Sequence, residues 1–303
     1  MIVIIAISLI IITRKTAHGL ETLKYIKLNK RYLIFSLISL FFFHLFDAIR
    51  LKIISRALNV NYSLFYGFLT SLANTFGATI TPFHIGGELV TFYMLGRKGI
   101  NIHKISTIVT IKAITGTISF AILLPVALYF LGIPHISKAD FITIVVIILA
   151  LAIVTFFGIK FIKYNRKMRS WFKNYIIMLL IFKRRGKKNF LLSIICSILI
   201  YLSFLSIAPF VVWSIKEVGS FFELFVKQLL LFYGVFLSPT PGGSGVGEIG
   251  AVLVYEGILE DKDLLAFAIL WRTMSQYLSG FIGALVIAIM HLYDLKLRAK
   301  GAY

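Results

Sequence analysis

The chain has 303 residues, of which 59% are hydrophobic, and its mean hydropathy is +0.93. One soluble core cannot hide that much apolar surface, so the composition excludes an ordinary soluble domain and indicates a membrane protein. The net charge of +20 does not indicate a nucleic-acid partner, because the basic residues lie between apolar runs, where they orient helices and meet anionic lipid headgroups.

Apolar runs close to the ~20 residues needed to cross the hydrocarbon layer recur along the chain. Backbone groups in lipid must be paired within their own segment, so these runs predict helices, and the alternation typical of a membrane barrel is absent. We therefore expect one integral domain over 1–303, an all-α polytopic membrane helix bundle of about six to eight membrane segments. The predicted segments, in chain order, are 2–12 (or 2–20), 32–49, 64–81, 105–131, 141–162, 189–215, 221–255 and 264–292.

A basic segment at 160–188 sets the predicted topology. It carries eleven Lys or Arg and no acid, so it should be cytoplasmic, with 168–182 lying along the membrane surface. The acidic stretch 256–263 is then external, and 221–255 must enter and leave on one face as a re-entrant hairpin. The same scheme places 14–31, which has six basic residues, outside, so the N-terminal topology stays open. The predicted location is the cell membrane.

Two parts of the chain superpose when the numbering is shifted by 160. Gly87-Glu88 then falls on Gly247-Glu248, and Lys112 falls on Arg272. Each copy, at about 32–131 and 189–292, contains a span, an apolar run ending in Pro and Gly, an acid, and a basic residue 24 positions later. If the first copy is also re-entrant, the copies have opposite orientation, an architecture common among transporters.

Glu88, Lys112, Glu248 and Arg272 are the candidate site residues. Each charge at membrane depth costs at least ~2.5–3.5 kcal/mol, so each should face a cavity or a partner. One interpretation is two buried ion pairs that only hold helices together. The other is a polar site that receives a lipid headgroup or couples a proton. The two are compatible, because a pair can open to admit a ligand.

The prolines and glycines beside these acids predict the tips of the re-entrant hairpins. Proline breaks a helix, and glycine lets the backbone approach a ligand closely. A helix that begins after such a tip would point free amides at phosphate or carboxylate, although a plain loop is the alternative. The predicted tip residues are Pro82, Gly86, Gly87, Pro239, Pro241, Gly242, Gly243, Gly245 and Gly247.

Other patterns do not predict a site. The stretch 245–250 matches a dinucleotide fingerprint but follows no strand, and the six histidines lack metal-ligand spacing, so we expect no metal and no cofactor. Asp47 and Arg50 are interpreted as a pair at a helix end, although either could meet a headgroup. Cys196 is the single cysteine, so an intrachain disulfide is impossible.

The two tip motifs carry a resemblance to a known family. Residues 81–88 (Thr-Pro-Phe-His-Ile-Gly-Gly-Glu) and 238–248 (Ser-Pro-Thr-Pro-Gly-Gly-Ser-Gly-Val-Gly-Glu) resemble the paired signatures of the lysylphosphatidylglycerol synthase membrane-region family, also called flippase-like. The resemblance covers about 32–292. Members often show Glu-Arg where this chain has Ile111-Lys112, whereas Arg272 fits well.

The resemblance implies movement or handling of lipids with anionic or polyprenyl-phosphate headgroups. In bacterial synthases the membrane domain is thought to translocate a lysyl-lipid made by a soluble C-terminal domain. This chain ends eleven residues past the last predicted span, so we expect a stand-alone translocase, not an enzyme. Its partners would be membrane lipids and, as a membrane subunit, a separate synthase or glycosyltransferase.

Two other hypotheses stay open. An intramembrane enzyme that modifies a lipid or lipid carrier would need a general base, for which Glu248 is the best candidate. A scaffold that assembles a synthase would use the four charges for structure alone.

Overall fold

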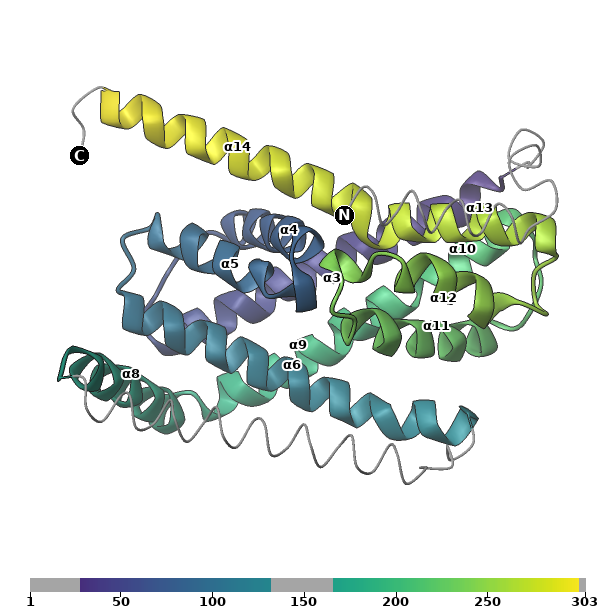
Figure 1. Ribbon diagram of the computed structural model, residues 1–303. Coiled ribbons are helices and arrows are strands. Elements are labelled where there is room, and N and C mark those ends of the chain that lie inside the picture. The colour runs from purple at the N-terminus through teal and green to yellow at the C-terminus, as the bar shows by residue number, and fades with distance from the viewer. Residues whose placement is uncertain (1–27, 132–165, 300–303) are drawn as a thin grey trace.

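The computed structural model describes residues 28–131 and 166–299, and within these ranges it is built of helices without a strand (Figure 1). The predicted all-α membrane bundle is therefore confirmed, while the predicted segments at 2–20 and 141–162 lie outside the described residues. The long helices are α3 (Lys30–Ala57), α4 (Leu64–Ile80), α5 (Gly86–Gly96), α6 (Ile102–Leu131), α8 (Arg166–Arg185), α9 (Lys187–Leu205), α10 (Ile207–Ile215), α11 (Phe221–Phe236), α12 (Val246–Tyr255), α13 (Asp261–Arg272) and α14 (Leu278–Ala299). Short turns η1 (Pro82–His84), η2 (Pro241–Gly243) and the π-helical η3 (Thr273–Tyr277) join some of them.

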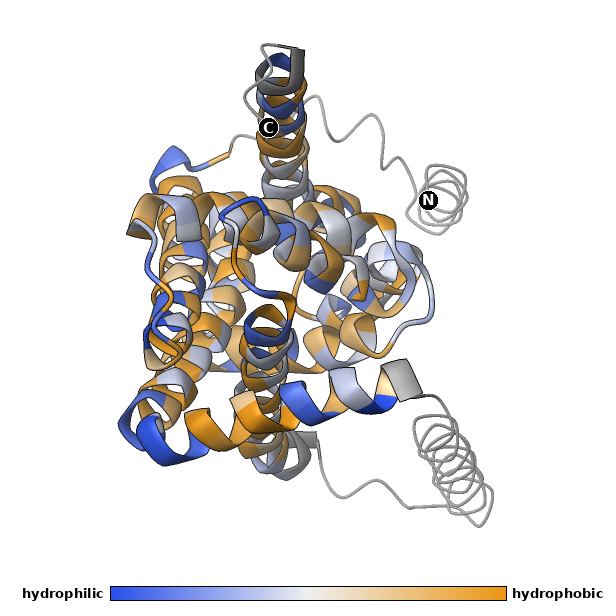
Figure 2. Cartoon of the chain, turned by 90° about the vertical axis from the view of Figure 1, so that its left-hand side faces the viewer, coloured by the Kyte–Doolittle hydropathy of each residue, from blue (hydrophilic) through white to orange (hydrophobic). Residues whose placement is uncertain are grey.

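Polar and apolar side chains are distributed as in a membrane protein. Large apolar side chains such as Phe65 and Phe281 are 70% and 66% exposed, whereas many serines, threonines and charged residues are buried. Hydrophobic residues cover much of the outside of the bundle (Figure 2). Among the described residues, four helical stretches are long and apolar enough to cross a bilayer: Lys30–Ala57, Ile102–Pro125, Lys187–Ile215 and Asp261–Lys296. The chain is therefore a multi-pass integral membrane protein.

Helix α3 is central and carries a polar stripe. It packs against α4, α9 and α10, and its lipid-facing side exposes residues such as Ile34 and Phe41. The buried polar residues of α3 are Ser36, Ser39, His44, Asp47, Arg50 and Ser55. Asp47 and Arg50 therefore do not form the helix-end pair that the sequence suggested, because α3 continues to Ala57 and buries both against α9.

Two helical hairpins meet tip to tip in the middle of the molecule. The α4–α5 hairpin opens toward one end of the bundle and the α11–α12 hairpin toward the other (Figure 1). At the meeting point, the Gly242 amide donates to the Thr81 carbonyl over 3.3 Å. The hairpins lie where the sequence predicts them; that their tips reach membrane depth stays a prediction.

The first tip is closed by Thr81 and Pro82. Thr81 has extended backbone angles (φ −123°, ψ 148°), as expected before a proline, and this ends α4. The Thr81 hydroxyl donates to the Gly77 carbonyl over 2.9 Å and accepts from the Gly86 amide over 2.8 Å. The threonine thus pairs groups that the broken helix would leave without partners.

The second tip turns on two glycines in left-handed conformations. Gly242 has φ +60° and Gly243 has φ +66°, both following Pro241. At the first tip, Phe83 (φ +51°) and His84 (φ +60°) hold the same conformations after a proline. Such angles are rare for a bulky side chain, so the first tip carries backbone strain that the second avoids.

Alanine at Gly242 should destabilise the protein through contact between the tips. Its methyl group would lie 2.6 Å from the Thr79 carbonyl oxygen on the other hairpin, in addition to the left-handed penalty. Gly99→Ala is the matched control, because Gly99 has φ +67° and an added methyl group would meet nothing within 4 Å. We expect the control to lose ~1–2 kcal/mol of folding stability and Gly242→Ala to lose a further ~1–3 kcal/mol, as measured by thermal unfolding in detergent. Equal losses would contradict tight packing of the tips.

The two ends of the bundle differ in charge. Helix α8 lies at the end where α4–α5 opens and carries seven basic residues and no acid (Figure 1). At the other end, the connections 216–223 and 256–263 carry six acids and two lysines. The start of α3 also lies at this acidic end, because the Asn29 amide donates to the Ser214 carbonyl over 2.7 Å. The first end is called the basic end below.

Candidate functional site

Arg272 lies at the meeting point of the tips, and each of its three guanidinium nitrogens donates a hydrogen bond. It donates to Glu248 Oε1 over 2.9 Å, to Gln276 Oε1 over 2.5 Å and to the Gly242 carbonyl over 3.0 Å. Its side chain and that of Glu248 are each 2% exposed. Arg272 therefore ties α13, α12 and the second tip together in a fully buried network.

Glu248 has no oxygen to spare. Oε1 accepts from Arg272 and, over 2.5 Å, from the Tyr277 hydroxyl, while Oε2 accepts from the Gly245 amide over 2.6 Å. The last contact caps the start of α12, which stabilises a carboxylate near a helix N-terminus. Both oxygens of Glu248 thus stabilise the local fold.

Local backbone features make room for this network. Gly247 has no side chain where one would meet the guanidinium: a methyl group there would lie 2.6 Å from Arg272 Cζ. The π-helical turn η3 directly follows Arg272 and contains Gln276 and Tyr277. Gln276 in turn donates to Thr79 Oγ1 over 3.3 Å, which connects the network to the first hairpin. π-Helical turns often occur at functional sites.

The equivalent pair of the first copy is more open. Lys112 Nζ lies 3.0 Å from Glu88 Oε1, and the side chains are 6% and 37% exposed, respectively. Glu88 Oε2 is buried and accepts no hydrogen bond from the described part of the chain. The structure therefore joins the four candidate charges as two acid–base pairs: the Glu248–Arg272 pair is closed, with both carboxylate oxygens hydrogen-bonded, and the Glu88–Lys112 pair is half open, with one buried carboxylate oxygen that has no described partner.

The pair Asp47–Arg50, which the sequence analysis assigned to a helix end, is a buried polar group near the open pair. Arg50 donates to Asp47 over 2.6 Å and to Ser197 over 2.9 Å, and Asp47 also interacts electrostatically with Lys112. The signal was available, because the polar residues of α3 recur at helical spacing along one face of an otherwise apolar span. Asp47 thus gives Lys112 a second acidic neighbour.

His44 extends this polar region across three helices. Its ring nitrogens lie 3.0 Å from Ser71 Oγ on α4 and 2.7 Å from Ser279 Oγ on α14. The imidazole is 1% exposed. It therefore connects the central helix, the first hairpin and the last helix at one point.

The predicted tip residues have different surroundings. Gly86, Gly87, Gly242, Gly243 and Gly247 are buried. Pro82 and Pro239 are exposed, and Pro241 and Gly245 are intermediate.

The first amides after the tips are not free. The Gly86 amide donates to Thr81 and the Gly245 amide donates to Glu248. The prediction of free amides therefore fails at these two positions, because a side chain from the same hairpin caps each helix.

Metal ligation has no support in the described residues, among which no group of three or more His, Cys, Asp or Glu is placed to hold an ion. The arrangement instead offers a buried ammonium whose partner Glu88 has a side chain that is 37% exposed, although the Oε2 atom of that carboxylate is itself buried. In such a pair another anion can replace the carboxylate beside the ammonium, and the buried positive charge is never left without a negative partner.

Comparison with known proteins agrees with the motifs. The family described as "Lysylphosphatidylglycerol synthase TM region" matches residues 2–283. A UPF0104 membrane protein of Archaeoglobus fulgidus is 23% identical over 276 residues, which cover 81% of this chain and 82% of that protein. The resemblance seen in the two tip motifs is thereby confirmed over nearly the whole chain.

Proposed function

Because the chain belongs to the lysylphosphatidylglycerol synthase transmembrane-region family, we propose that it is a lipid translocase that moves anionic or polyprenyl-phosphate headgroups across the cell membrane. The family name points to lipids as the molecules on which the protein acts. The proposal includes three further parts. The lipid moves without chemical change, the membrane is the cell membrane, and the protein acts together with a separate synthase or glycosyltransferase.

One observation carries the proposal: the Glu88–Lys112 pair is half open, whereas the Glu248–Arg272 pair is sealed. Lys112 is 5% exposed, so its charge is costly without a counter-ion. Glu88 supplies that counter-ion from a position with 37% side-chain exposure. A phosphate that enters beside Glu88 can take its place on Lys112, and the ammonium stays paired throughout.

The sealed pair has a different proposed role. Arg272 and Glu248 hold the tips together while the headgroup passes on the side of the first hairpin. Acyl chains remain in the bilayer against exposed apolar residues, so only the polar headgroup needs a path through the protein. In this proposal Lys112 and Glu88 interact with the headgroup. Arg272 and Glu248 keep the two hairpin tips in contact.

An intramembrane enzyme is the second candidate, and the geometry of Glu248 disfavours it. A general base needs a lone pair directed at substrate, whereas both Glu248 oxygens already accept hydrogen bonds within the protein. Glu88 Oε2 is unpartnered among the described residues, so a base at Glu88 would be the enzymatic alternative.

Purified protein in vesicles that contain a headgroup-labelled phosphatidylglycerol distinguishes the hypotheses. The proposed translocase exposes inner-leaflet label to a membrane-impermeant quencher, while mass spectrometry of the extracted lipid finds it unchanged. A new lipid product indicates the enzyme. Protein-containing vesicles that behave like protein-free vesicles on both readouts indicate the scaffold.

The proposed topology places the basic end in the cytoplasm and the acidic end outside. Lys188 and Gly257 are exposed at the two ends. Single cysteines at these positions, in a Cys196→Ser background, should react with an impermeant maleimide from opposite sides of the membrane. Reaction of both from the same side would contradict the opposed orientation of the two hairpins.

A further inference from the structure

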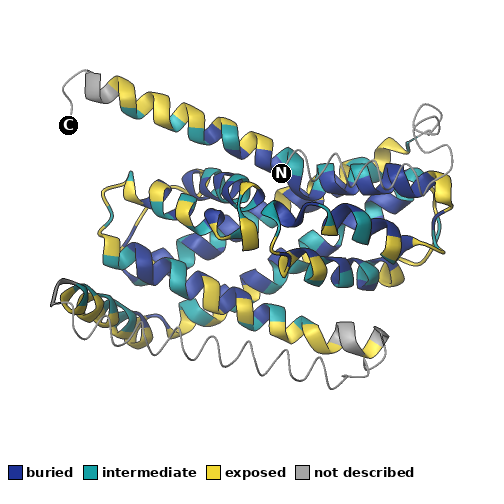
Figure 3. Cartoon of the chain, in the orientation of Figure 1, coloured by how far each residue is buried: buried dark blue, intermediate teal, exposed yellow. Residues whose placement is uncertain are grey.

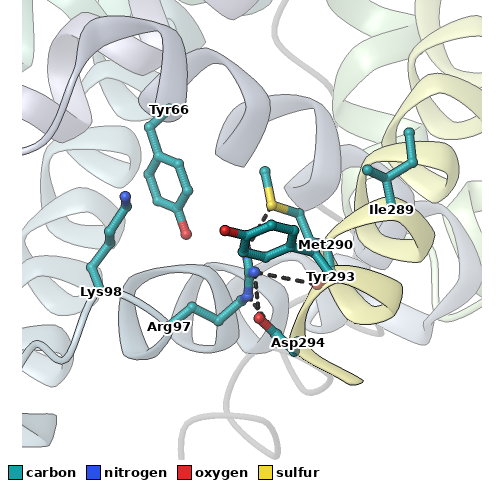
Figure 4. Close-up of a pocket in the computed structure, with 7 residues that line it drawn as sticks. All are labelled: Tyr66, Arg97, Lys98, Ile289, Met290, Tyr293 and Asp294. Atoms are coloured by element: carbon teal, nitrogen blue, oxygen red, sulfur yellow. Dashed lines mark hydrogen bonds and ion pairs between the residues drawn. The ribbon is translucent and has the colours of Figure 1, made fainter. Parts of the chain in front are cut away.

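A pocket of about 400 Å³ lies at the basic end, away from the two acid–base pairs. Its walls are Tyr66 on α4, Arg97 and Lys98 just after α5, and four residues of α14: Ile289, Met290, Tyr293 and Asp294 (Figure 4). Neither the proposed headgroup path nor the tip network uses these side chains.

Within the pocket, Arg97 is already neutralised. Its guanidinium makes two hydrogen bonds to the Asp294 carboxylate, of 2.6 and 2.5 Å, and another of 3.2 Å to the Met290 carbonyl. These contacts tie the end of α14 to the first hairpin. Arg97 and Asp294 together therefore add no net charge to the pocket.

Lys98 supplies the remaining charge. Its ammonium lies 4.6 Å from the centroid of the Tyr66 ring, and it forms no ion pair with any described carboxylate. The Tyr66 hydroxyl donates to the Met94 carbonyl over 2.6 Å, which holds the ring in place under the ammonium. Among the described residues that line it, the pocket thus presents one uncompensated positive charge, and that charge has a defined position.

Apart from Asp294, which is paired with Arg97, the opposite wall is apolar and continues into the region of the bilayer. Ile289 and Tyr293 are 64% and 57% exposed. Ile282 and Leu285 are also exposed, and their spacing along α14 places them on the same side of the helix as Ile289. Much of α14 is open to its surroundings (Figure 3). The helix then reaches Lys296, as expected where a span leaves the hydrocarbon layer.

We propose that this pocket binds a phospholipid of the leaflet at the basic end, with its phosphodiester on Lys98 and an acyl chain along the exposed face of α14. A phosphodiester carries one negative charge, which matches the single uncompensated cation. A soluble anion would use the cation and leave the apolar wall uncovered, whereas a lipid covers both. The proposal requires membrane insertion but not transport.

Photocrosslinking in nanodiscs tests the site without measuring transport. The probe is a phosphatidylglycerol with a photoreactive group on its acyl chain, and labelled peptides from α14 are quantified by mass spectrometry. Lys98→Gln should lower α14 labelling about fivefold, the change that corresponds to ~1 kcal/mol per cation near a membrane surface. Lys98→Arg keeps the charge and should retain labelling.

Lys188→Gln is the matched control, because Lys188 is an exposed lysine at the same end and outside the pocket. We expect its labelling of α14 to equal that of the unmodified protein. Unchanged labelling in Lys98→Gln, or equal losses in Lys98→Gln and Lys188→Gln, would overturn the site. Loss of labelling on addition of inorganic phosphate would instead assign the pocket to a soluble anion and also overturn the lipid proposal. Each result can be read whether or not the protein transports lipid.

Discussion

Arg272→Gln is expected to cost ~3–5 kcal/mol of stability, because it leaves a buried carboxylate without its counter-ion. Glu248 is 2% exposed, so water cannot replace the lost guanidinium. The change also removes donors to Gln276 Oε1 and to the Gly242 carbonyl at the second tip. The expected result is a large fall in the unfolding temperature in detergent and a low yield of folded protein.

The double variant Glu248→Gln/Arg272→Gln distinguishes the cost of an unpaired buried charge from the cost of the lost hydrogen bonds. Replacing both partners removes the uncompensated charge, so part of the lost stability should return. Recovery should be incomplete, because the Gly242 carbonyl and the capped Gly245 amide lose strong partners. Arg169→Gln, at an exposed arginine of α8, is the control and should change stability little. Unaltered stability in Arg272→Gln would contradict the role of Arg272 as the connection between the tips.

The pairing of the four charges could be anticipated from sequence for a physical reason. A charge inside an apolar run needs a partner, and equal acid-to-base spacing in two copies offered one for each. The hairpins could also be predicted. The charges of the flanking loops require each apolar run to enter and leave on one side, and Pro and Gly interrupt the run where it turns. The observed tip-to-tip contact of Gly242 with Thr81 had no local signal, since it joins segments far apart in the chain.

The difference between the two pairs could not be predicted either. The seal around Arg272 depends on Gln276 and Tyr277, which the π-helical turn η3 brings beside the pair, and an α-helical pattern does not reveal such a turn. Asp47 and Arg50 were assigned to a helix end because the basic residues after them resembled a loop. In the structure α3 simply continues, and packing against α9 buries the pair.

Lys112→Gln is expected to abolish most headgroup movement while the protein remains folded. Its partner Glu88 has 37% side-chain exposure, so that side chain can turn toward its surroundings, and Asp47 keeps its contact with Arg50. A charge-assisted hydrogen bond to a phosphate is worth ~1.5–3 kcal/mol, so the rate should fall about ten- to a hundredfold. Lys112→Arg retains the charge and should retain much of the rate.

Glu88→Gln/Lys112→Gln completes the set, because it removes both charges of the open pair. If the pair only holds helices together, this neutral variant should fold and transport normally. If Lys112 receives the headgroup, the variant should fold but move no more lipid than Lys112→Gln. Unfolding temperature and transport rate measured on the same preparations keep stability and function apart.

Headgroup movement in vesicles, compared between the unmodified protein and Glu88→Gln/Lys112→Gln, tests most directly whether anionic lipids cross at the open pair. The unmodified protein should equilibrate labelled phosphatidylglycerol between leaflets without altering it, and the folded double variant should leave most inner-leaflet label protected from the quencher. A folded double variant that equilibrates the label at the unmodified rate would contradict the assignment of the headgroup path to Glu88 and Lys112.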